Sequence, residues 1–191
     1  MSGITIWVTT ILSLMGLGIA FFYMKKVVSI PLDLGLDEEQ SKKLTFIHGA
    51  IADGAMAFLK QEYKVLTIFM AVFAAIIAIL IDNTHTPDIH EGIYTAIAFL
   101  FGGAISIASG YIGMKVATQG NARTTVSAKK DISAAYDVAI NSGAVMGFAL
   151  VGLATLGLVI IYVVMSWLLA DLGPENNHIL MDVIAGYGLG G

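Results

Sequence analysis

The composition of this chain separates it from soluble proteins. It has 191 residues, of which 57% are hydrophobic and only 13% are charged, with ten Lys and Arg against fourteen Asp and Glu. A typical soluble domain is about 45–50% apolar and about 25% charged. These values exclude a water-soluble domain and a disordered chain, and the acidic balance excludes a basic nucleic-acid-binding protein. The absence of cysteine excludes a disulfide framework, a thiolate metal site and a cysteine nucleophile.

Four long charge-free runs predict helices that cross a membrane. The runs cover residues 4–24, 65–81, 92–114 and 138–170, and a spanning helix needs about 20 mostly apolar residues. None of them alternates with the period of two that a barrel strand requires. We place the spans at 4–24, 65–81, 92–114 and 145–169, with a fifth from about residue 180. The sequence therefore predicts an all-α polytopic bundle, with residues 1–191 forming a single, incomplete membrane domain.

The positions of the basic residues predict the orientation. All ten lie in two connections, 25–64 and 115–137, whereas the connections 82–91 and 171–182 carry only acidic charges. The positive-inside rule places the basic connections in the cytoplasm and the amino terminus outside. The first run is followed, not preceded, by lysines, so it is not a signal peptide. We expect a multi-pass protein of the cell (inner) membrane.

Both basic connections are expected to contain long helical extensions. Residues 37–40, with the sequence DEEQ, resemble a helix start with a capping-box spacing, and the helix can continue unbroken from 38 to 81. The alternative is an amphipathic helix on the membrane surface, broken near Gly54. Asn121 is expected to cap a second long helix over 122–170.

Small residues at four-residue steps predict close helix packing. Gly143 and Gly147 form one such pair in the fourth span, and Gly102, Ser106 and Gly110 form a series in the third span. This spacing places small side chains on one face, where another helix backbone can approach. It is common in membrane bundles and does not identify a function.

Three groups of polar residues are candidates for chemistry. A metal site in the external connection would use His85 and His90 with the neighbouring acids Asp82, Asp88 and Glu91. Imidazole and carboxylate are good ligands, but the spacing matches no compact ligand pattern and favours a solvated loop.

The other two groups are also explained without catalysis. His48 and Asp53 are five residues apart and do not share a helix face, which favours surface or helix-contact roles. Asp182, at the expected start of the fifth helix, is explained as a favourable charge at a helix amino end. The glycine-rich stretch 186–191 lacks the Lys-Ser/Thr of a phosphate loop. No ionisable residue lies within the four runs, so we predict no catalytic, cofactor-binding or metal-binding residue.

Several motifs, in order along the chain, carry a family resemblance. They are GA at 49–50 with GAMAFLKQEY at 54–63, SGYIGMKVA at 109–117, NARTT at 121–125, SGAVMGF at 142–148 and GYGLGG at 186–191. Together they resemble the amino-terminal helices of the membrane-bound, ion-translocating pyrophosphatases. The chain departs from the family pattern at Tyr187, where Phe is expected, at Gly120, where Ala is usual, and at Asn141, where a basic residue is frequent.

The resemblance implies the function of a longer parent protein. Such a protein is a homodimeric membrane enzyme that hydrolyses cytoplasmic pyrophosphate with Mg²⁺ and exports H⁺ or Na⁺, in some members with K⁺ dependence. Its helices form an inner ring with the hydrolytic site and an outer ring, to which the first four helices belong. The motifs that bind magnesium pyrophosphate follow the part matched here, so the chain alone is predicted to be inactive. The alternative function is a non-enzymatic membrane scaffold or a transporter subunit, which a stop codon after Gly191 would favour.

Overall fold

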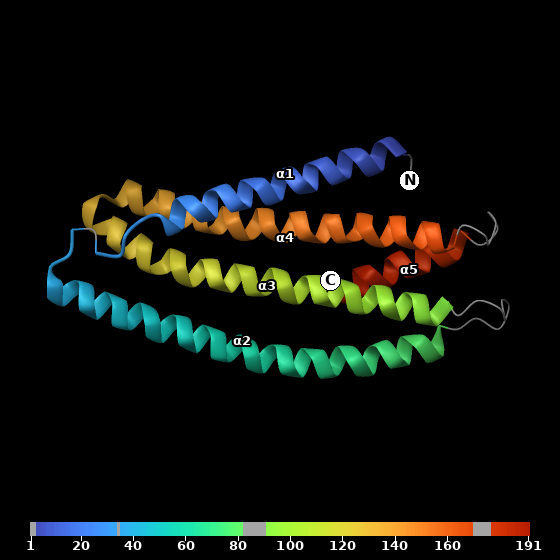
Figure 1. The fold of residues 1–191 in the computed structure, drawn as a ribbon. Helices are drawn as coiled ribbons and strands as arrows, with labels where there is room; N and C mark the ends of the chain where they lie inside the picture. Colours follow the sequence, from blue (N-terminus) through green and yellow to red (C-terminus); the bar gives the residue numbers. More distant parts are fainter. Residues whose placement is uncertain (1–2, 34, 82–90, 170–176) are drawn as a thin grey trace. The chain divides into compact units, whose positions relative to one another are not determined.

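The structure is built from helices alone in the residues that it describes. This computed structural model describes residues 3–33, 35–81, 91–169 and 177–191, with the side chain of residue 177 left out. Its helices are α1 (Gly3–Val28), α2 (Glu38–Leu80), α3 (Glu91–Lys130), α4 (Ile132–Leu168) and α5 (Asn177–Gly190), as Figure 1 shows. The predicted all-α fold is therefore confirmed.

Four of the helices are suited to crossing a membrane. The most apolar 18-residue windows of α1, α2, α3 and α4 have mean hydropathies of 2.0, 2.4, 1.7 and 2.6. Each helix exceeds the roughly 20 residues that span a bilayer at 1.5 Å per residue. The shorter α5, with 14 residues, begins a further apolar segment. The prediction of four complete spans and the start of a fifth is confirmed.

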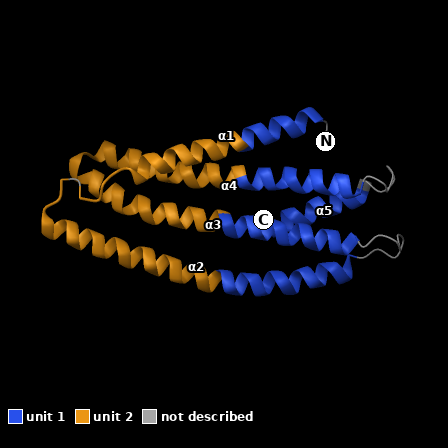
Figure 2. Cartoon of the chain, in the orientation of Figure 1, with its two compact units in different colours: residues 1–13, 63–108, 153–191 blue, residues 14–62, 109–152 orange. Residues whose placement is uncertain are grey.

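The chain divides into two compact units, coloured separately in Figure 2. Unit 1 comprises residues 1–13, 63–108 and 153–191, and unit 2 comprises residues 14–62 and 109–152. Helices α2, α3 and α4 each contribute residues to both units. Each interhelical contact given below joins two residues of the same unit, either unit 1 or unit 2.

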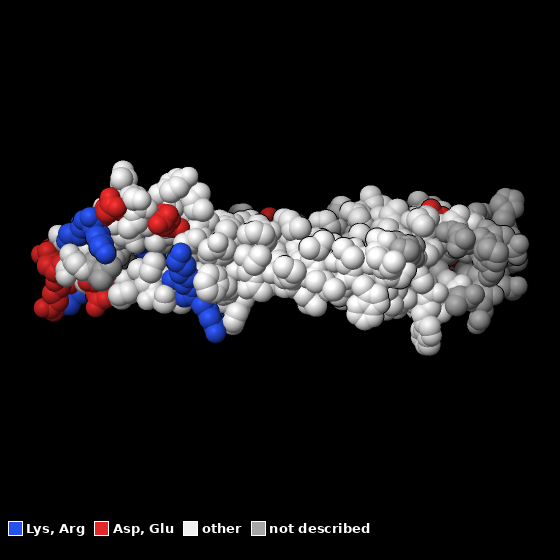
Figure 3. Space-filling view, turned by 90° about the horizontal axis from the view of Figure 1, so that it is seen from above, with Lys and Arg blue, Asp and Glu red and all other residues white. Residues whose placement is uncertain are grey.

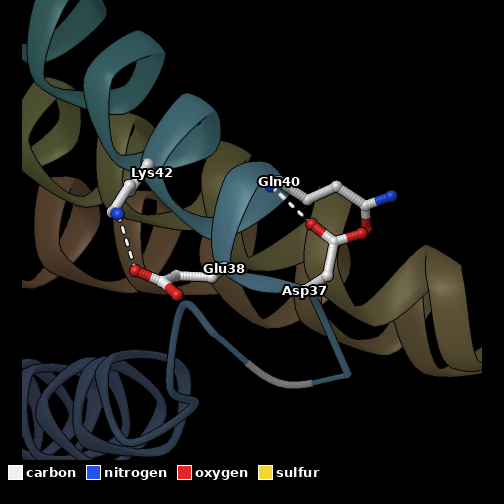
Figure 4. A network of polar contacts seen from close by, with 4 residues as sticks. All are labelled: Asp37, Glu38, Gln40 and Lys42. Carbon is white, nitrogen blue, oxygen red and sulfur yellow. Dashed lines mark hydrogen bonds and ion pairs between the residues drawn. The ribbon is translucent and has the colours of Figure 1, made fainter.

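The first turn of α2 forms as the sequence predicts. The Asp37 side chain accepts a hydrogen bond from the Gln40 backbone N–H at 2.8 Å, so that Asp37 is the N-cap (Figure 4). One turn further, the Lys42 ammonium lies 2.6 Å from the Glu38 carboxylate. From this start α2 continues to Leu80 without interruption. The continuous helix is confirmed, and the alternative break near Gly54 does not occur.

The prediction that Asn121 caps a helix over 122–170 is wrong. Helix α3 passes through Asn121 and ends at Lys130, and α4 begins at Ile132. The single residue between them is Asp131, whose backbone carbonyl accepts the Ala135 N–H at 3.2 Å. Asp131 therefore occupies the N-cap position of α4, a position at which aspartate is strongly preferred.

Packing in unit 2 explains why α3 does not break at Asn121. A Cβ placed on the neighbouring Gly120 would lie 2.4 Å from Ser142 Oγ of α4, so the two helices touch closely at this turn. Val116, Ala122 and Val126 of α3 are buried around it. A side-chain cap contributes about 1 kcal/mol, whereas helices in proteins are held mainly by tertiary packing of this kind.

The predicted small-residue face of α3 does pack against another helix in unit 1. A Cβ on Gly102 would lie only 2.3 Å from the Tyr187 carbonyl oxygen of α5, closer than real Cβ atoms approach. One turn further along α3, Ser106 Oγ donates a hydrogen bond to the Gly191 carbonyl at 3.1 Å. Glycine and serine at these positions therefore allow direct contact between the α3 and α5 backbones.

The glycines of α5 complete the same contact from the other side. A Cβ on Gly186 would lie 2.7 Å from the Thr95 carbonyl oxygen, and one on Gly190 would lie 2.0 Å from the Phe99 carbonyl oxygen. Both neighbours belong to α3 and are buried. The glycine-rich stretch at 186–191 is thus an interhelical packing surface in unit 1.

The predicted packing through Gly143 and Gly147 is not observed in the described residues. Both glycines are exposed, and a Cβ on either would meet no atom within 4 Å. Helix α4 instead buries Val138, Val145 and Ala149 in unit 2. These three residues recur at steps of seven and four, and that series defines the contact face of this helix.

Candidate functional site

Charged side chains of unit 2 gather at one end of this unit. Seen from above, Lys, Arg, Asp and Glu cluster where α2 begins and where α3 meets α4 (Figure 3). The apolar parts of the helices carry almost no charge in the same view. A polar functional site of unit 2 is therefore expected at this charged end.

Arg123 of α3 is the most buried charged residue of this end, with only 7% of its surface exposed. Its Nη2 donates to the Val28 carbonyl at 3.2 Å, and its Nη1 donates to the backbone and side-chain oxygens of Gln119 at 3.1 and 2.6 Å. Val28 is the last residue of α1, where carbonyls lack helical partners and the helix dipole is negative. Arg123 thus caps α1 from α3.

The Arg123 guanidinium keeps its charge in this position. Burial lowers the pKa of Arg123, but the guanidinium is so strongly basic that arginine stays protonated in proteins. The three oxygens that accept its hydrogen bonds are uncharged, and its Nε is buried without a hydrogen-bond partner. This cap was not predicted from the sequence, although Arg123 is the only arginine in the chain.

The predicted pair of His48 and Asp53 does not come together. His48 lies 3.5 Å from the Gln119 side-chain amide, nitrogen to nitrogen, whereas Asp53 is exposed. A second contact between α2 and α3 joins the Lys129 ammonium to the Gln40 side-chain oxygen. These contacts hold α2 to α3 in unit 2, which agrees with the helix-contact role expected for His48.

The predicted external cluster lies mostly outside the described residues. Asp82, His85, Asp88 and His90 belong to the part that the structure does not describe. Glu91, which begins α3, is only 2% exposed, and its carboxylate lies 4.0 Å from Nε2 of His178 in α5.

Asp182 does not begin α5 as the sequence analysis expected. The helix starts at Asn177, so Asp182 lies within its second turn and is exposed. The favourable first-turn position for an acidic residue is therefore not the one that Asp182 occupies.

Tyr187, one of the departures from the family pattern, is buried in unit 1. Its hydroxyl donates to the Ala154 carbonyl of α4 at 2.6 Å, and its ring contacts Phe101 with centroids 6.1 Å apart. A Cβ on Gly157 would lie 2.6 Å from this hydroxyl. Gly157 thus leaves the space that a tyrosine hydroxyl needs and a phenylalanine would not use.

Within the described residues, no three His, Asp or Glu side chains come close enough to hold a metal ion. The polar contacts described above join helices, and they bring together no nucleophile with a base. Their chemistry is that of capping and helix-to-helix hydrogen bonding.

These features define a polytopic α-helical membrane protein with long helical extensions and tightly packed glycine contacts. The chain belongs to the family described as inorganic H⁺ pyrophosphatase, whose profile matches residues 14–191. The family resemblance drawn from the sequence motifs is therefore confirmed.

Curated relatives carry names of both proton and sodium pumps. A "K(+)-insensitive pyrophosphate-energized proton pump" of Chloroflexus aurantiacus is 30% identical over 98% of this chain and 24% of its own length. A protein of the same name from Methanosarcina mazei is 29% identical over 97% of this chain and 23% of its own length. A "Putative K(+)-stimulated pyrophosphate-energized sodium pump" of Clostridium tetani is 42% identical over 56% of this chain and 14% of its own length. The chain thus spans about a quarter or less of these relatives.

Proposed function

We propose that residues 1–191 form the amino-terminal, outer-ring part of a pyrophosphate-energised cation pump. The observation that carries this proposal is the family match over residues 14–191, together with relatives that are named as such pumps. The pump would hydrolyse cytoplasmic diphosphate with water to two phosphates and use the released free energy to export H⁺ or Na⁺. The relatives include pumps named for protons and for sodium, so the proposal covers either H⁺ or Na⁺ as the transported ion.

The catalytic groups belong, in this proposal, to the part of the pump beyond these helices. Phosphoryl transfer needs carboxylates that hold metal ions and cations that stabilise the transferring group. The described residues hold no cluster of three potential ligands. The charge-free runs offer no Asp, Glu, Lys, Arg or His side chain for moving an ion through about 30 Å of hydrocarbon. Mg²⁺, a stimulating K⁺ and a homodimeric assembly are proposed for the whole pump on the family resemblance.

The activity test compares the natural gene product that carries these residues with residues 1–191 alone. We expect the whole pump to release phosphate from pyrophosphate only when Mg²⁺ is present, and to move a cation into inverted membrane vesicles. We expect the 191-residue chain to do neither. Imidodiphosphate, whose bridging nitrogen resists hydrolysis, is the control substrate.

Two results would contradict this proposal in different ways. Magnesium-dependent hydrolysis by residues 1–191 would place catalysis inside these helices. A folded whole protein that stays inactive with Mg²⁺ and K⁺ would count against a pyrophosphatase pump and favour a membrane scaffold.

The proposed orientation places the amino terminus outside and the basic connections in the cytoplasm, because all ten Lys and Arg lie at 25–64 and 115–137. The chain has no cysteine, so single cysteines can replace Lys42, Lys129, His85 and Asn176. In intact cells we expect an impermeant maleimide to label positions 85 and 176 but not 42 and 129. All four should react after the cells are lysed, and the reverse pattern in intact cells would overturn the orientation.

A further inference from the structure

A cavity of about 250 Å³ lies within unit 2 between the end of α1, the end of α3 and the start of α4. Its lining combines two kinds of side chain. Val27, Val138 and the hydroxyl-bearing Ser127 are each no more than 5% exposed. Lys26 and Lys130 also line the cavity and are exposed to solvent. The cavity thus joins a buried, mostly apolar lining to exposed cationic side chains.

The charges around the cavity suit a single negative charge. Lys26 and Lys130 contribute two positive charges, and Asp137 contributes one negative charge. Asn141 and Ser127 add groups that can form hydrogen bonds with oxygen atoms. The net charge of plus one complements the one negative charge of a phosphodiester. The volume suits such a group with its glycerol and is below the 300–1,000 Å³ of pockets for drug-sized ligands.

The sequence on two of the three helices places this cavity at a membrane boundary. On α1 the exposed side chains of Phe21 and Phe22 precede Lys25 and Lys26 by one turn. On α4 the charge-free run begins directly after Asp137. Aromatic side chains next to lysines are typical of the level at which lipid headgroups lie. Basic pockets between helices at this level bind the headgroups of anionic lipids.

We propose that this cavity binds the phosphate headgroup of an anionic phospholipid, with Lys26 and Lys130 as its cationic ligands. One acyl chain of the lipid would extend from the cavity along the exposed apolar surface of α1. The neighbouring lysines have other contacts: Lys25 lies over the Phe21 ring at 4.5 Å, and Lys129 is bonded to Gln40. The proposal depends on the membrane setting of the chain and not on its catalytic role.

The test measures lipid binding to the purified natural protein by native mass spectrometry in detergent. Phosphatidylglycerol and phosphatidylcholine with the same acyl chains are titrated against the protein and its variants. A lysine near a phosphate contributes a factor of about five to binding, so Lys26→Gln and Lys130→Gln should each weaken phosphatidylglycerol binding about fivefold. Asp137→Asn removes a repelling charge and should strengthen it, an effect that misfolding cannot imitate.

The matched controls are Lys25→Gln and Lys129→Gln, which change the same charge one residue away and should leave binding unchanged. Equal losses in the controls and the cavity variants would show only general attraction to the basic surface and would overturn the site. Equal binding of the two lipids would overturn it as well. Displacement of the lipid by millimolar inorganic phosphate would identify a site for a soluble anion instead. Unchanged binding in all lysine variants would also overturn the site, because Lys26 and Lys130 would then not be ligands of the headgroup.

Discussion

Replacing Gly102 with alanine is expected to destabilise the protein by about 1–3 kcal/mol, the usual cost of overpacking. The new methyl group would lie 2.3 Å from the Tyr187 carbonyl oxygen and 3.0 Å from the Gly191 backbone nitrogen. Both are backbone atoms, so no side chain can rotate away and the helices α3 and α5 must separate locally. In a bilayer helices associate largely through such close packing. Thermal unfolding in detergent, followed by circular dichroism, measures the loss.

Gly188→Ala is the matched control for this prediction. Gly188 lies on the same helix as Gly186 and Gly190, but a Cβ there would meet no atom within 4 Å. Alanine is favoured over glycine in a helix by up to about 1 kcal/mol, so this variant should equal or exceed the parent in stability. Equal unfolding temperatures for Gly102→Ala and Gly188→Ala would contradict the close contact between α3 and α5.

Arg123→Ala is expected to lower stability by about 2–3 kcal/mol. The substitution leaves the Val28 carbonyl and the Gln119 side-chain oxygen without the donors that now lie at 3.2 and 2.6 Å. A hydrogen bond from a charged donor contributes about 1.5–3 kcal/mol, and the volume vacated by the buried Arg123 side chain adds a cavity. Chemical unfolding in detergent, followed by circular dichroism, provides the measurement.

Two further variants separate the capping role of Arg123 from its charge. Arg123→Lys keeps the charge but cannot donate in several fixed directions, so it should recover only part of the loss. Lys115→Ala removes an exposed charge from the same helix and should change stability by no more than about 0.5 kcal/mol. Full recovery by lysine would show that the charge alone stabilises this end of α1.

The number and kind of the helices could be predicted because apolar length is a strong signal. Each charge-free run is long enough to span a bilayer and shows no strand periodicity. The start of α2 was equally readable, since Asp37 and Gln40 have the spacing of a capping motif and form its hydrogen bond. Local sequence determines these features, and tertiary contacts do not compete with them.

The boundary between α3 and α4 could not be predicted for the opposite reason. Asn121 and Asp131 are both good N-cap residues, and only one of them lies where the chain turns. The choice depends on Gly120 packing against Ser142, a contact between residues from different helices. Local capping preferences cannot rank two candidates when packing decides between them.

The packing faces of the apolar helices were only partly predictable. Gly102 and Ser106 do contact α5, whereas Gly143 and Gly147, with the same spacing, are exposed. A helix that is apolar all round carries no polar face to mark its orientation. Small-residue spacing therefore shows where another helix can pack closely, but it does not identify whether a partner helix lies there.

The charged contacts of unit 2 were the least predictable part of the chain. The sequence suggested His48 and Asp53 as a pair, but the structure brings His48 to Gln119 and Arg123 to Val28. The partners of Arg123 include a backbone carbonyl from a helix far away in the sequence. A backbone group has no sequence signature, so its partner can be found only once the helices are placed.

The single residue between α3 and α4 also restricts how the length of this chain can change. Inserting one residue at Asp131 would rotate α4 by about 100° relative to α3, which would turn Val138 and Val145 out of their buried positions in unit 2. The non-helical connection between α1 and α2 includes Gly35 with a φ of 70°, and its described residues, 29–33 and 35–37, are exposed or half-buried. Surface loops of this kind accept extra residues at small cost. Insertions and deletions among natural variants of this chain are therefore expected at 29–37 and not at 131.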